Sequence, residues 1–388
     1  MVKNNSARVA IIALSDISKD PRVMRQIDAL SLDYEITVIG FGDVPPARCS
    51  FIQIPHRRRG AMAKLRHFFS LMTKRHEAAL QSSPHVLEVL PILKNVHFDL
   101  IIANDIETLP MVFADDRKIG LVFFDAHEYA EQEWGSWRWR YLYGSLRRYM
   151  CRKYIPKCCG MMTVCKGIAD RFYVDLGILP TVITNAPLRS DLIPSPVLPD
   201  RIRLIHHGRA MPERQIEDMI TAMRYLDERF TLDLMLIPGT PGYLEHLKRI
   251  SFSISTVRFL EPVRMQDLPT ATNGYDMGVY LLSPTSFNNH YALPNKFFEY
   301  IQARLGVAIG PSPEMARIVR EFSLGVVATD FSPRAFAASL MSVNQQSLVN
   351  YKISSHRAAK VLNSDSNAKV IRRLVNAALK RNSGSLND

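Results

Sequence analysis

The stretch that decides the fold is "RVAIIALSDISKDPRVMRQIDALSL", residues 8–32. Residues 8–14 form a continuous apolar run, which is typical of a strand covered on both faces of a parallel sheet. A polar loop follows, and residues 21–32 carry apolar side chains at helical spacing. Asp20 is a good helix N-cap and Pro21 a good first helical residue. The stretch therefore predicts one strand–loop–helix unit of an α/β domain.

This alternation of strand and helix continues along the chain. Further runs that indicate strands are 35–41, 99–104, 120–126, 160–165 and 180–186, then 201–208, 231–239, 257–263, 277–282, 306–311 and 325–330. Further runs with helical spacing are 166–177, 213–226, 296–305 and 312–322. The pattern predicts an α/β protein of two doubly wound, Rossmann-like domains with parallel sheets, facing a central cleft that holds the ligands.

A proline-rich segment, residues 185–201, interrupts the alternation and is interpreted as the interdomain linker. We therefore predict a first domain over residues 1–190 and a second over residues 198–365. Residues 366–388 are predicted to form a basic helix, able to cross back to the first domain, and a short tail.

The positive charge of the chain is concentrated in its first half. The 388 residues carry a formal net charge of +12. Residues 57–75 and residues 138–157 each contain seven Lys and Arg and no acid, and all three tryptophans lie beside the second stretch. Aromatic rings next to cations suit an anionic membrane surface or a solvated helix face equally well. They suit nucleic acid less, because no recognised nucleic-acid module is present.

The sequence contains no run of about 18 uncharged apolar residues, and its N-terminus lacks the long apolar core of a signal peptide. Its five cysteines have no framework spacing, which suits free thiols in a reducing compartment. We therefore expect a cytoplasmic protein, peripheral on the inner face of the membrane if the basic stretches bind lipid.

Polar residues follow two of the predicted strands of the first domain. His127 and Glu128 follow the strand in "LVFFDAHEYAEQE" (121–133), and Asn104 and Asp105 end another strand. Carboxyl ends of parallel strands meet at one edge of a sheet, where ligands bind. We expect His127 to be catalytic or to contact substrate, although a lone histidine is often structural. Asn104, Asp105 and Glu128 are expected to bind the acceptor.

Arginines follow strands in both domains. Arg22 lies in the first turn of the helix 21–32, where free amides and a guanidinium suit an anion such as a diphosphate. The simpler interpretation is a capped helix start. Gly208 ends a strand, and Arg209 and Arg214 follow it. Two guanidiniums there can converge on phosphate oxygens, unless they are ordinary surface arginines paired with glutamates.

The segment "HYALPNKFFEY", residues 290–300, combines a turn with a charged helix start. Pro294 prevents helix before it, Asn295 is predicted to be the N-cap, and Lys296 and Glu299 lie on one helical face. A lysine beside free helix amides suits phosphate, and a carboxylate one turn later can accept two hydrogen bonds from a ribose diol.

Taken together, "DPRVMRQIDAL", "FFDAHE", "VITNAP", "GRAMPER" and "LPNKFFEYIQARLGVAIG" occur in an order that resembles the group-1 (family 4) retaining glycosyltransferases of the GT-B fold. The resemblance spans about residues 8–335. It implies that the first domain binds the acceptor and the second a nucleotide-sugar.

The resemblance also implies individual roles. His127 looks like the family's cleft histidine that contacts the transferred sugar. Arg209 and Arg214 look like its basic pair on the donor diphosphate. Glu299 looks like the last glutamate of the family's E-x7-E motif, which holds the ribose hydroxyls.

Two positions depart from the family pattern. Tyr291 stands where the first glutamate of E-x7-E commonly contacts the donor sugar, and we still place it among the donor-binding residues with Gly208, Pro294, Asn295 and Lys296. Gln215 stands where the family usually has a glycine. The identity of the donor sugar is therefore open.

We expect a retaining glycosyltransferase that moves a sugar from a nucleoside-diphosphate sugar to a lipid-linked or polysaccharide acceptor in bacterial envelope glycan synthesis. No cofactor and no metal is expected, because arginines can neutralise the leaving diphosphate. The alternatives are a nucleotide-sugar 2-epimerase of the same fold and a degenerate, non-catalytic sugar-nucleotide-binding protein. No nucleic-acid partner is expected.

Overall fold

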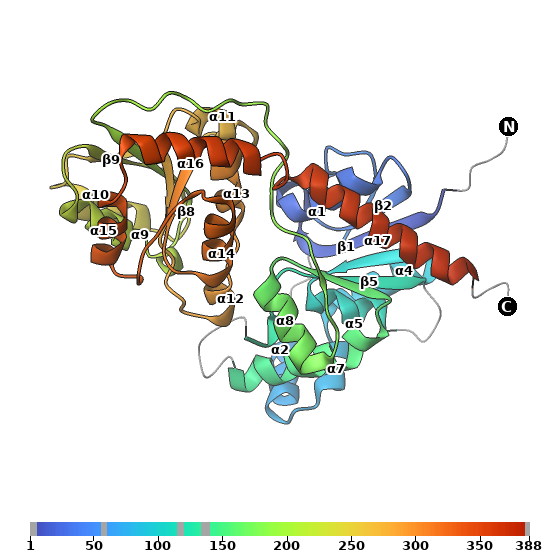
Figure 1. The fold of residues 1–388 in the computed structure, drawn as a ribbon. Helices are drawn as coiled ribbons and strands as arrows, with labels where there is room; N and C mark the ends of the chain where they lie inside the picture. Colours follow the sequence, from blue (N-terminus) through green and yellow to red (C-terminus); the bar gives the residue numbers. More distant parts are fainter. Residues whose placement is uncertain (1–5, 56–59, 115–119, 133–139, 385–388) are drawn as a thin grey trace. The chain divides into compact units, whose positions relative to one another are not determined.

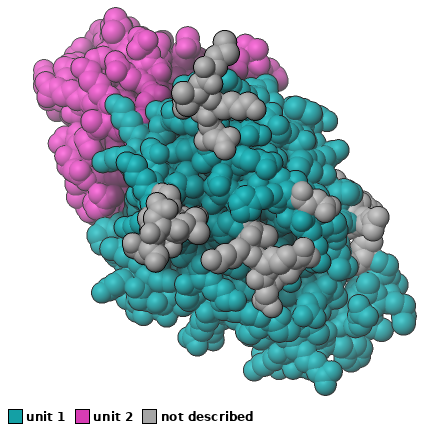
Figure 2. Space-filling view, turned by 90° about the vertical axis from the view of Figure 1, so that its right-hand side faces the viewer, with its two compact units in different colours: residues 1–184, 286–288, 367–388 teal, residues 185–285, 289–366 magenta. Residues whose placement is uncertain are grey.

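The computed structural model describes residues 6–55, 60–114, 120–132 and 140–384. The chain divides into two compact units, each an α/β body of its own (Figures 1 and 2). Unit 1 comprises Met1–Thr184, Ser286–Asn288 and Asn367–Asp388, and unit 2 comprises Asn185–Thr285 and Asn289–Ser366.

The described residues of unit 1 form a seven-stranded sheet in the order β3-β2-β1-β4-β5-β6-β7, and every pair of neighbours is parallel. The strands are β1 (Arg8–Asp16), β2 (Glu35–Phe41), β3 (Ser50–Gln53), β4 (Leu100–Asn104), β5 (Leu121–Ala126), β6 (Gly160–Thr163) and β7 (Thr181–Val182). Five consecutive residues of β1, Val9 to Ala13, are buried, as expected for a central strand covered on both faces. The strand order reverses at β1, which lies between β2 and β4.

Helices join these strands (Figure 1). They are α1 (Pro21–Leu30), α2 (Ala61–Met72), α3 (His76–Gln81), α4 (Pro84–Asn95), α5 (Leu109–Val112), α7 (Ser145–Tyr154) and α8 (Lys166–Leu176), with short turns of helix at η1 (Ile17–Lys19), η2 (Ile106–Thr108), η3 (Ala130–Gln132), η4 (Arg140–Gly144) and η5 (Ile155–Lys157). Asp20 caps α1 as predicted, because its carboxylate accepts hydrogen bonds from the amides of Arg22 and Val23. Pro21 begins the helix.

The last helix, α17 (Ser364–Gly384), contributes to the core of unit 1. Its residues Ile371, Val375 and Ala378 are buried in one cluster with β1, β2, β4 and α1. Asn367 donates to the carbonyl of Thr184, and Figure 1 shows the helix in red beside α1. The C-terminal helix therefore packs on the first unit, although its sequence follows the second.

The described residues of unit 2 form a six-stranded parallel sheet in the order β10-β9-β8-β11-β12-β13. The strands are β8 (Ile202–Ala210), β9 (Phe230–Pro238), β10 (Val257–Leu260), β11 (Met277–Tyr280), β12 (Gly306–Ile309) and β13 (Gly325–Val327). The helices are α9 (Ile216–Ala222), α10 (Tyr243–Ser251), α11 (Leu268–Thr272), α13 (Asn295–Gln302), α14 (Pro313–Phe322), α15 (Pro333–Met341) and α16 (Gln345–Ala358), with η6 (Pro212–Arg214), η7 (Met223–Tyr225) and η8 (Met265–Asp267). The short helix α12 (Phe287–His290) is divided between the two units. Here the strand order reverses at β8.

The predicted fold class is confirmed: both units are doubly wound parallel sheets. Residues 183–198 contain neither helix nor strand, as expected for a proline-rich linker. Strand β3 and the helices α2 to α4 are additional to the predicted elements. All five cysteines are free thiols, and Cys159 is exposed. Among the described residues, no helix is long and apolar enough to cross a lipid bilayer.

Candidate active site

Unit 1 gathers a buried polar network at the carboxyl ends of β1, β4 and β5, where its strand order reverses. Arg22 of α1 is buried and donates from Nε and Nη2 to the two oxygens of Asp125, at 2.8 and 2.6 Å. Its Nη1 donates to the carbonyl of Ile183 at 2.8 Å. This differs from the donor contact expected of Arg22, because all three guanidinium nitrogens are bound within unit 1. The first-turn amides are equally occupied, by Asp20.

The network continues through two amide side chains. Gln26 donates to Asp125 at 2.5 Å and to the Oδ1 atom of Asn104 at 2.8 Å. Asn104 donates in return to Gln26 at 3.1 Å and to the carbonyl of Ile12 at 3.3 Å. Asn104 is buried, and it faces this network rather than the pocket described below. The structure therefore makes Asn104 a support for its neighbours, where an acceptor contact was expected.

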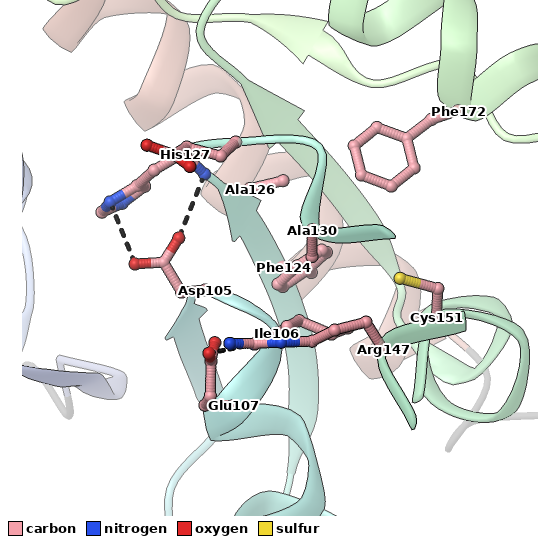
Figure 3. A pocket seen from close by; sticks show the side chains of 11 residues that line it. Asp105, Ile106, Glu107, Phe124, Ala126, His127, Ala130, Arg147, Cys151 and Phe172 are labelled. Atoms are coloured by element: carbon pink, nitrogen blue, oxygen red, sulfur yellow. Dashed lines mark hydrogen bonds and ion pairs between the residues drawn. The ribbon is translucent and has the colours of Figure 1, made fainter. Parts of the chain in front are cut away.

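His127 lies where this network meets the surface of unit 1. Its Nε2 is 3.1 Å from the Oδ1 of Asn104. Its Nδ1 is 3.2 Å from Asp105, the contact drawn in Figure 3. Both partners of the ring are oxygen acceptors, so both ring nitrogens are placed to donate. The backbone of Asp105 has φ +63° and ψ 156°, a strained conformation for a residue with a side chain. That strain holds the Asp105 carboxylate against both the ring and the amide of His127.

The two carboxylates beside His127 have opposite pKa shifts. Burial acts to raise the pKa of Asp125, but Arg22, His127 and the hydrogen bonds from Arg22 and Gln26 outweigh it and lower this pKa. The pKa of Asp105 is raised, mainly by desolvation and with Glu107 and Asp125 adding to it, although His127 opposes the shift. Asp125 is therefore the charged partner of Arg22, whereas the charged form of Asp105 is less favoured.

A pocket of about 230 Å³ opens beside His127 within unit 1. Figure 3 shows Asp105 and His127 facing each other, with the ion pair of Glu107 and Arg147 next to them. The remaining lining residues are Ile106, Phe124, Ala126, Glu128, Ala130, Cys151 and Phe172. The predicted residues Asp105, His127 and Glu128 therefore share one pocket, whose carboxylates can accept hydrogen bonds from hydroxyl groups.

Unit 2 has a second cluster, at the end of β8, where its own strand order reverses. His206 is completely buried, and its Nδ1 is 2.9 Å from the carbonyl of Val279. A carbonyl only accepts, so Nδ1 carries the proton and Nε2 is an acceptor. That acceptor lies 3.3 Å from Nζ of Lys296 on α13. Burial, followed by the charge of Lys296, holds the pKa of His206 well below its ordinary value, so the ring is neutral.

Lys296 is a buried lysine with little compensating charge. Its Nζ lies 4.7 Å from the ring centre of Tyr280, and its side chain extends toward Gly208. Gly208 has φ +136°, and a Cβ there would lie 2.9 Å from Nζ. Burial and then Arg214 lower the pKa of Lys296 well below its ordinary value, while Glu299 opposes the shift. A ligand with negative charge would restore the charged ammonium.

The other charged groups of this cluster lie close by. Nε of Arg214 is buried without a hydrogen-bond partner among the described residues. Glu299 is nearly buried one turn after Lys296, and its Oε2 lies 3.5 Å from Nε2 of His207. Burial, with the charge of Lys296, lowers the pKa of His207 to about 3, so this ring is neutral as well. The cluster thus presents two basic side chains, Lys296 and Arg214, and one carboxylate.

Other predicted donor residues lie around this cluster. Helix α13 begins at Asn295, so Pro294 occupies the N-cap position predicted for Asn295, and no side chain caps the helix. The aromatic ring of Tyr291 packs edge-on against His290. Arg209 is exposed at the end of β8. Its convergence with Arg214 on a donor diphosphate stays a prediction.

The conformation of Gln215 explains one departure from the family pattern. Gln215 has φ +48° and ψ 47°, in the left-handed region where glycine has no steric cost. A glycine at this position would therefore suit the same backbone.

Several site residues were missed by sequence reasoning. His206 and His207 stand directly before Gly208 in "LIHHG", so their place at a strand end was a usable signal. Arg147 and Cys151 come from α7, far from the strand-end motifs, and only the tertiary fold brings them to the pocket. Among the described residues, no three or more His, Cys, Asp or Glu side chains are grouped so that they could hold a metal ion.

Comparison with known proteins gives a fold and nothing finer. No protein-family model matches the sequence, and no curated protein matches it. Solved structures do match. Sucrose-phosphate synthase (tll1590) from Thermosynechococcus elongatus has a TM-score of 0.74 at 12% identity, covering 97% of this chain and 100% of that one. Anabaena Alr3699/HepE in complex with UDP-glucose has a TM-score of 0.68 at 14% identity, covering 96% and 100%.

A third match is WaaG, a glycosyltransferase involved in lipopolysaccharide biosynthesis, with a TM-score of 0.64 at 16% identity, covering 94% of this chain and 99% of that one. Identities this low carry the fold alone. With its two parallel-sheet units, the chain has the GT-B fold of these glycosyltransferases.

Proposed function

We propose that this protein is a retaining glycosyltransferase that moves a sugar from a nucleoside-diphosphate sugar, bound at the β8–α13 cluster of unit 2, to an acceptor bound at the His127 pocket of unit 1. The observation that carries the proposal is Lys296, a buried lysine whose pKa is lowered by burial and by Arg214, with Glu299 opposing this shift only in part. The buried Nε of Arg214 also has no hydrogen-bond partner in the part of the chain that the structure describes. A diphosphate would satisfy both groups.

The chemistry follows from this charge. As the bond between the anomeric carbon and the donor oxygen breaks, negative charge builds up on the departing diphosphate. Lys296 and Arg214 are pre-positioned to stabilise it, and loss of one such group typically costs about 10²–10³ in rate. Glu299 is placed to accept hydrogen bonds from the ribose hydroxyls. Because side-chain cations supply the charge, we propose transfer without a metal; activity lost in EDTA and restored by Mn²⁺ would refute this.

In unit 1, His127 and Asp105 border the acceptor pocket. The ring is fixed through Asn104 and the Asp105 carboxylate, so it can meet an incoming hydroxyl group in a defined orientation. Asp105 and Glu128 offer acceptors for further hydroxyls. The neighbouring proteins of known structure include one bound to UDP-glucose, which supports a nucleotide-sugar donor here.

A second pocket supports a lipid-linked acceptor. This pocket of about 200 Å³ is lined largely by apolar side chains, including Leu80, Met111 and Met150, and shares Glu107 and Arg147 with the His127 pocket. A polar cavity beside an apolar one, with an arginine at their boundary, suits an amphiphile with a sugar or phosphate head. We therefore propose a lipid-linked acceptor of bacterial envelope glycan synthesis, used on the cytoplasmic side of the membrane; a polysaccharide remains the alternative.

The testing experiment is a thermal-shift panel of UDP-, GDP-, ADP- and dTDP-sugars on wild type and Lys296→Met. One nucleotide class is expected to raise the melting temperature of the wild type by mass action, and to lose that effect in the variant. Incubation without acceptor then separates transfer from epimerisation, because a 2-epimerase would convert the donor alone. No shift with any nucleotide-sugar would overturn the proposal.

The stereochemistry is tested by NMR of the first product formed. Retention predicts that the anomeric configuration of the transferred sugar matches that of the donor. Inversion would contradict this part of the proposal while leaving donor binding intact.

A further inference from the structure

Helix α2 carries an apolar stripe on its outer surface. The stripe consists of side chains that are between 44% and 81% exposed: Met62, Leu65, Phe68, Phe69 and Met72. With about 100° between successive residues of a helix, these five fall within a single arc of about 120°. An ordinary surface helix carries polar side chains along this arc.

The opposite face of α2 holds the helix on unit 1. Ser70 and Leu71 are buried there, and His67 on the same side lines the apolar pocket that adjoins the His127 pocket. The stripe is therefore not an unfinished core, because the helix already has a buried face. Soluble proteins rarely expose a continuous apolar surface without a partner for it.

The charges around the stripe indicate which partner it has. Lys64 and Arg66 are exposed on the two sides of the stripe, one on each flank by helical geometry. Lys74 and Arg75 follow the helix and are also exposed. The sequence adds three arginines directly before it, at 57–59, and contains no acid from residue 57 to residue 75. An apolar stripe between cations complements a surface with phosphates above hydrocarbon.

Aromatic side chains next to α2 point to the same partner. The short helix η4 contacts α2, and its Tyr141 and Tyr143 are exposed. Tyrosine is favoured at the boundary between lipid headgroups and hydrocarbon, because its ring is apolar and its hydroxyl is polar.

We propose that α2 docks unit 1 on an anionic lipid bilayer, with the stripe among the acyl chains and Lys64 and Arg66 at the level of the phosphates. A second copy of the chain is the less suitable occupant, because pairing two stripes would bring two basic patches together. Only the purpose of this docking rests on the proposed function: docking would bring a lipid acceptor to the apolar pocket that His67 lines.

The test is co-sedimentation of the full chain with vesicles of equal parts phosphatidylglycerol and phosphatidylcholine, and with vesicles of phosphatidylcholine alone. Wild type is expected to bind the anionic vesicles and to be released by salt. Leu65→Ser with Phe69→Ser should lower the partition coefficient about tenfold or more, because two apolar side chains no longer enter the hydrocarbon.

A charge variant and a matched control complete the set. Lys64→Gln with Arg66→Gln should lower binding about tenfold to anionic vesicles alone. Val174→Ser, which changes an apolar residue on α8 that is more exposed than Leu65 and Phe69, should bind like wild type. Folding of each variant is checked by circular dichroism and by thermal melting without ligand, which do not depend on the proposed function.

The outcomes separate this inference from the proposed function. Wild type that stays in the supernatant, or a stripe variant that binds as well as wild type, overturns the inference even if sugar transfer is observed. A stripe substitution that converts a dimer into a monomer, without vesicle binding, also overturns it. Stripe-dependent vesicle binding without any nucleotide-sugar binding would support the docking helix and contradict the proposed function.

Discussion

The two units place their polar clusters at the same point of the same kind of sheet, yet with opposite charge. In unit 1 the reversal point of the strand order holds two carboxylates around His127, and a buried arginine, Arg22, is the counter-ion of one of them, Asp125. In unit 2 it holds Lys296 and Arg214 around a single carboxylate, Glu299. The fold therefore fixes where a ligand binds, and the side chains decide whether it brings hydroxyl groups or phosphates.

The two clusters also differ in how complete they are. In unit 1, every nitrogen of the Arg22 guanidinium has a partner and the pKa of Asp125 is lowered, so the network stabilises the folded unit. In unit 2, the pKa of Lys296 is lowered, so burying this side chain on folding is unfavourable until an anionic ligand binds. This difference predicts that equivalent substitutions will affect stability in one unit and binding in the other.

The largest effect is expected for Asp125→Asn in unit 1. Removing the charge leaves Arg22 buried beside a neutral partner, which typically costs about 3–5 kcal/mol. Native-state hydrogen exchange should show faster exchange of α1 and β5, with unit 2 as the internal reference. Asp170→Asn, in the exposed pair with Lys166, is the control and should cost less than about 1 kcal/mol.

The same pair predicts an acid dependence. The folded pKa of Asp125 lies below its ordinary value of 3.8, so its stabilisation is complete above that value and is lost as pH falls through the folded pKa. Asp125→Asn should lack this loss. If the stability of the variant and of the wild type fell equally at low pH, the charge of Asp125 would not stabilise the folded unit 1.

The next largest effect is expected for Lys296→Met. Transfer should fall about 10²–10³-fold, because the cation on the leaving diphosphate is gone. The unliganded unit should lose no stability, since a buried amine whose charged form is disfavoured is replaced by an apolar chain. Steady-state kinetics and thermal melting without ligand measure the two effects.

Lys352→Met is the matched control in the same unit. Lys352 is as buried as Lys296, but its Nζ donates to the carbonyl of Tyr275 and to Ser195, at 2.6 and 2.8 Å. Its loss should destabilise unit 2 and leave nucleotide-sugar affinity unchanged. If both lysine variants changed stability and nucleotide-sugar affinity in the same way, the distinction between a structural and a ligand-binding lysine would be wrong.

A smaller effect is expected for Gly208→Ala. The left-handed backbone at φ +136° and the Cβ at 2.9 Å from Lys296 should together cost about 1–3 kcal/mol. Donor affinity should also fall about tenfold, because the ammonium must move. Gly242→Ala also has a positive φ, of +77°, but no atom lies within 4 Å of the added Cβ, so it should cost stability without affecting donor affinity, as isothermal titration can test.

Sequence patterns were sufficient to predict the two parallel sheets and the candidate site residues that lie at the ends of strands. Continuous apolar runs such as that of β1 predicted parallel strands, and strand-end residues such as His127 and Asp105 share a pocket. These inferences succeed because strand ends in a parallel sheet meet at one edge whatever the loops do.

Long-range partners were beyond sequence patterns. Arg22 was expected at an open helix start, but its counter-ion Asp125 is 103 residues away, and no local rule links them. Arg147 reaches the pocket from α7 for the same reason. The exposed stripe of α2 could not be predicted either. Apolar residues at helical spacing normally indicate the buried face of a helix, and only the structure shows that α2 buries a different face.

The smallest effect expected is a pH dependence of donor binding that runs opposite to that of stability. The pKa of Lys296 lies below its ordinary value of 10.5, so between the two the unfolded chain holds a proton that the folded chain lacks. Stability without ligand therefore rises with pH through this window. A diphosphate favours the protonated ammonium, so affinity should fall over the same window, by at most about tenfold per pH unit.

Titration calorimetry in buffers of different ionisation enthalpy would measure the proton taken up when the nucleotide-sugar binds. Lys352 contributes a stability change of the same sign, since burial lowers its pKa to about 8, so Lys296→Met is the necessary reference. Proton uptake by wild type and none by the variant would assign the proton to Lys296. Equal proton uptake by both proteins would mean that a group other than Lys296 is protonated on binding. The contrast between a charge-compensated unit 1 and an uncompensated Lys296 in unit 2 would then be wrong.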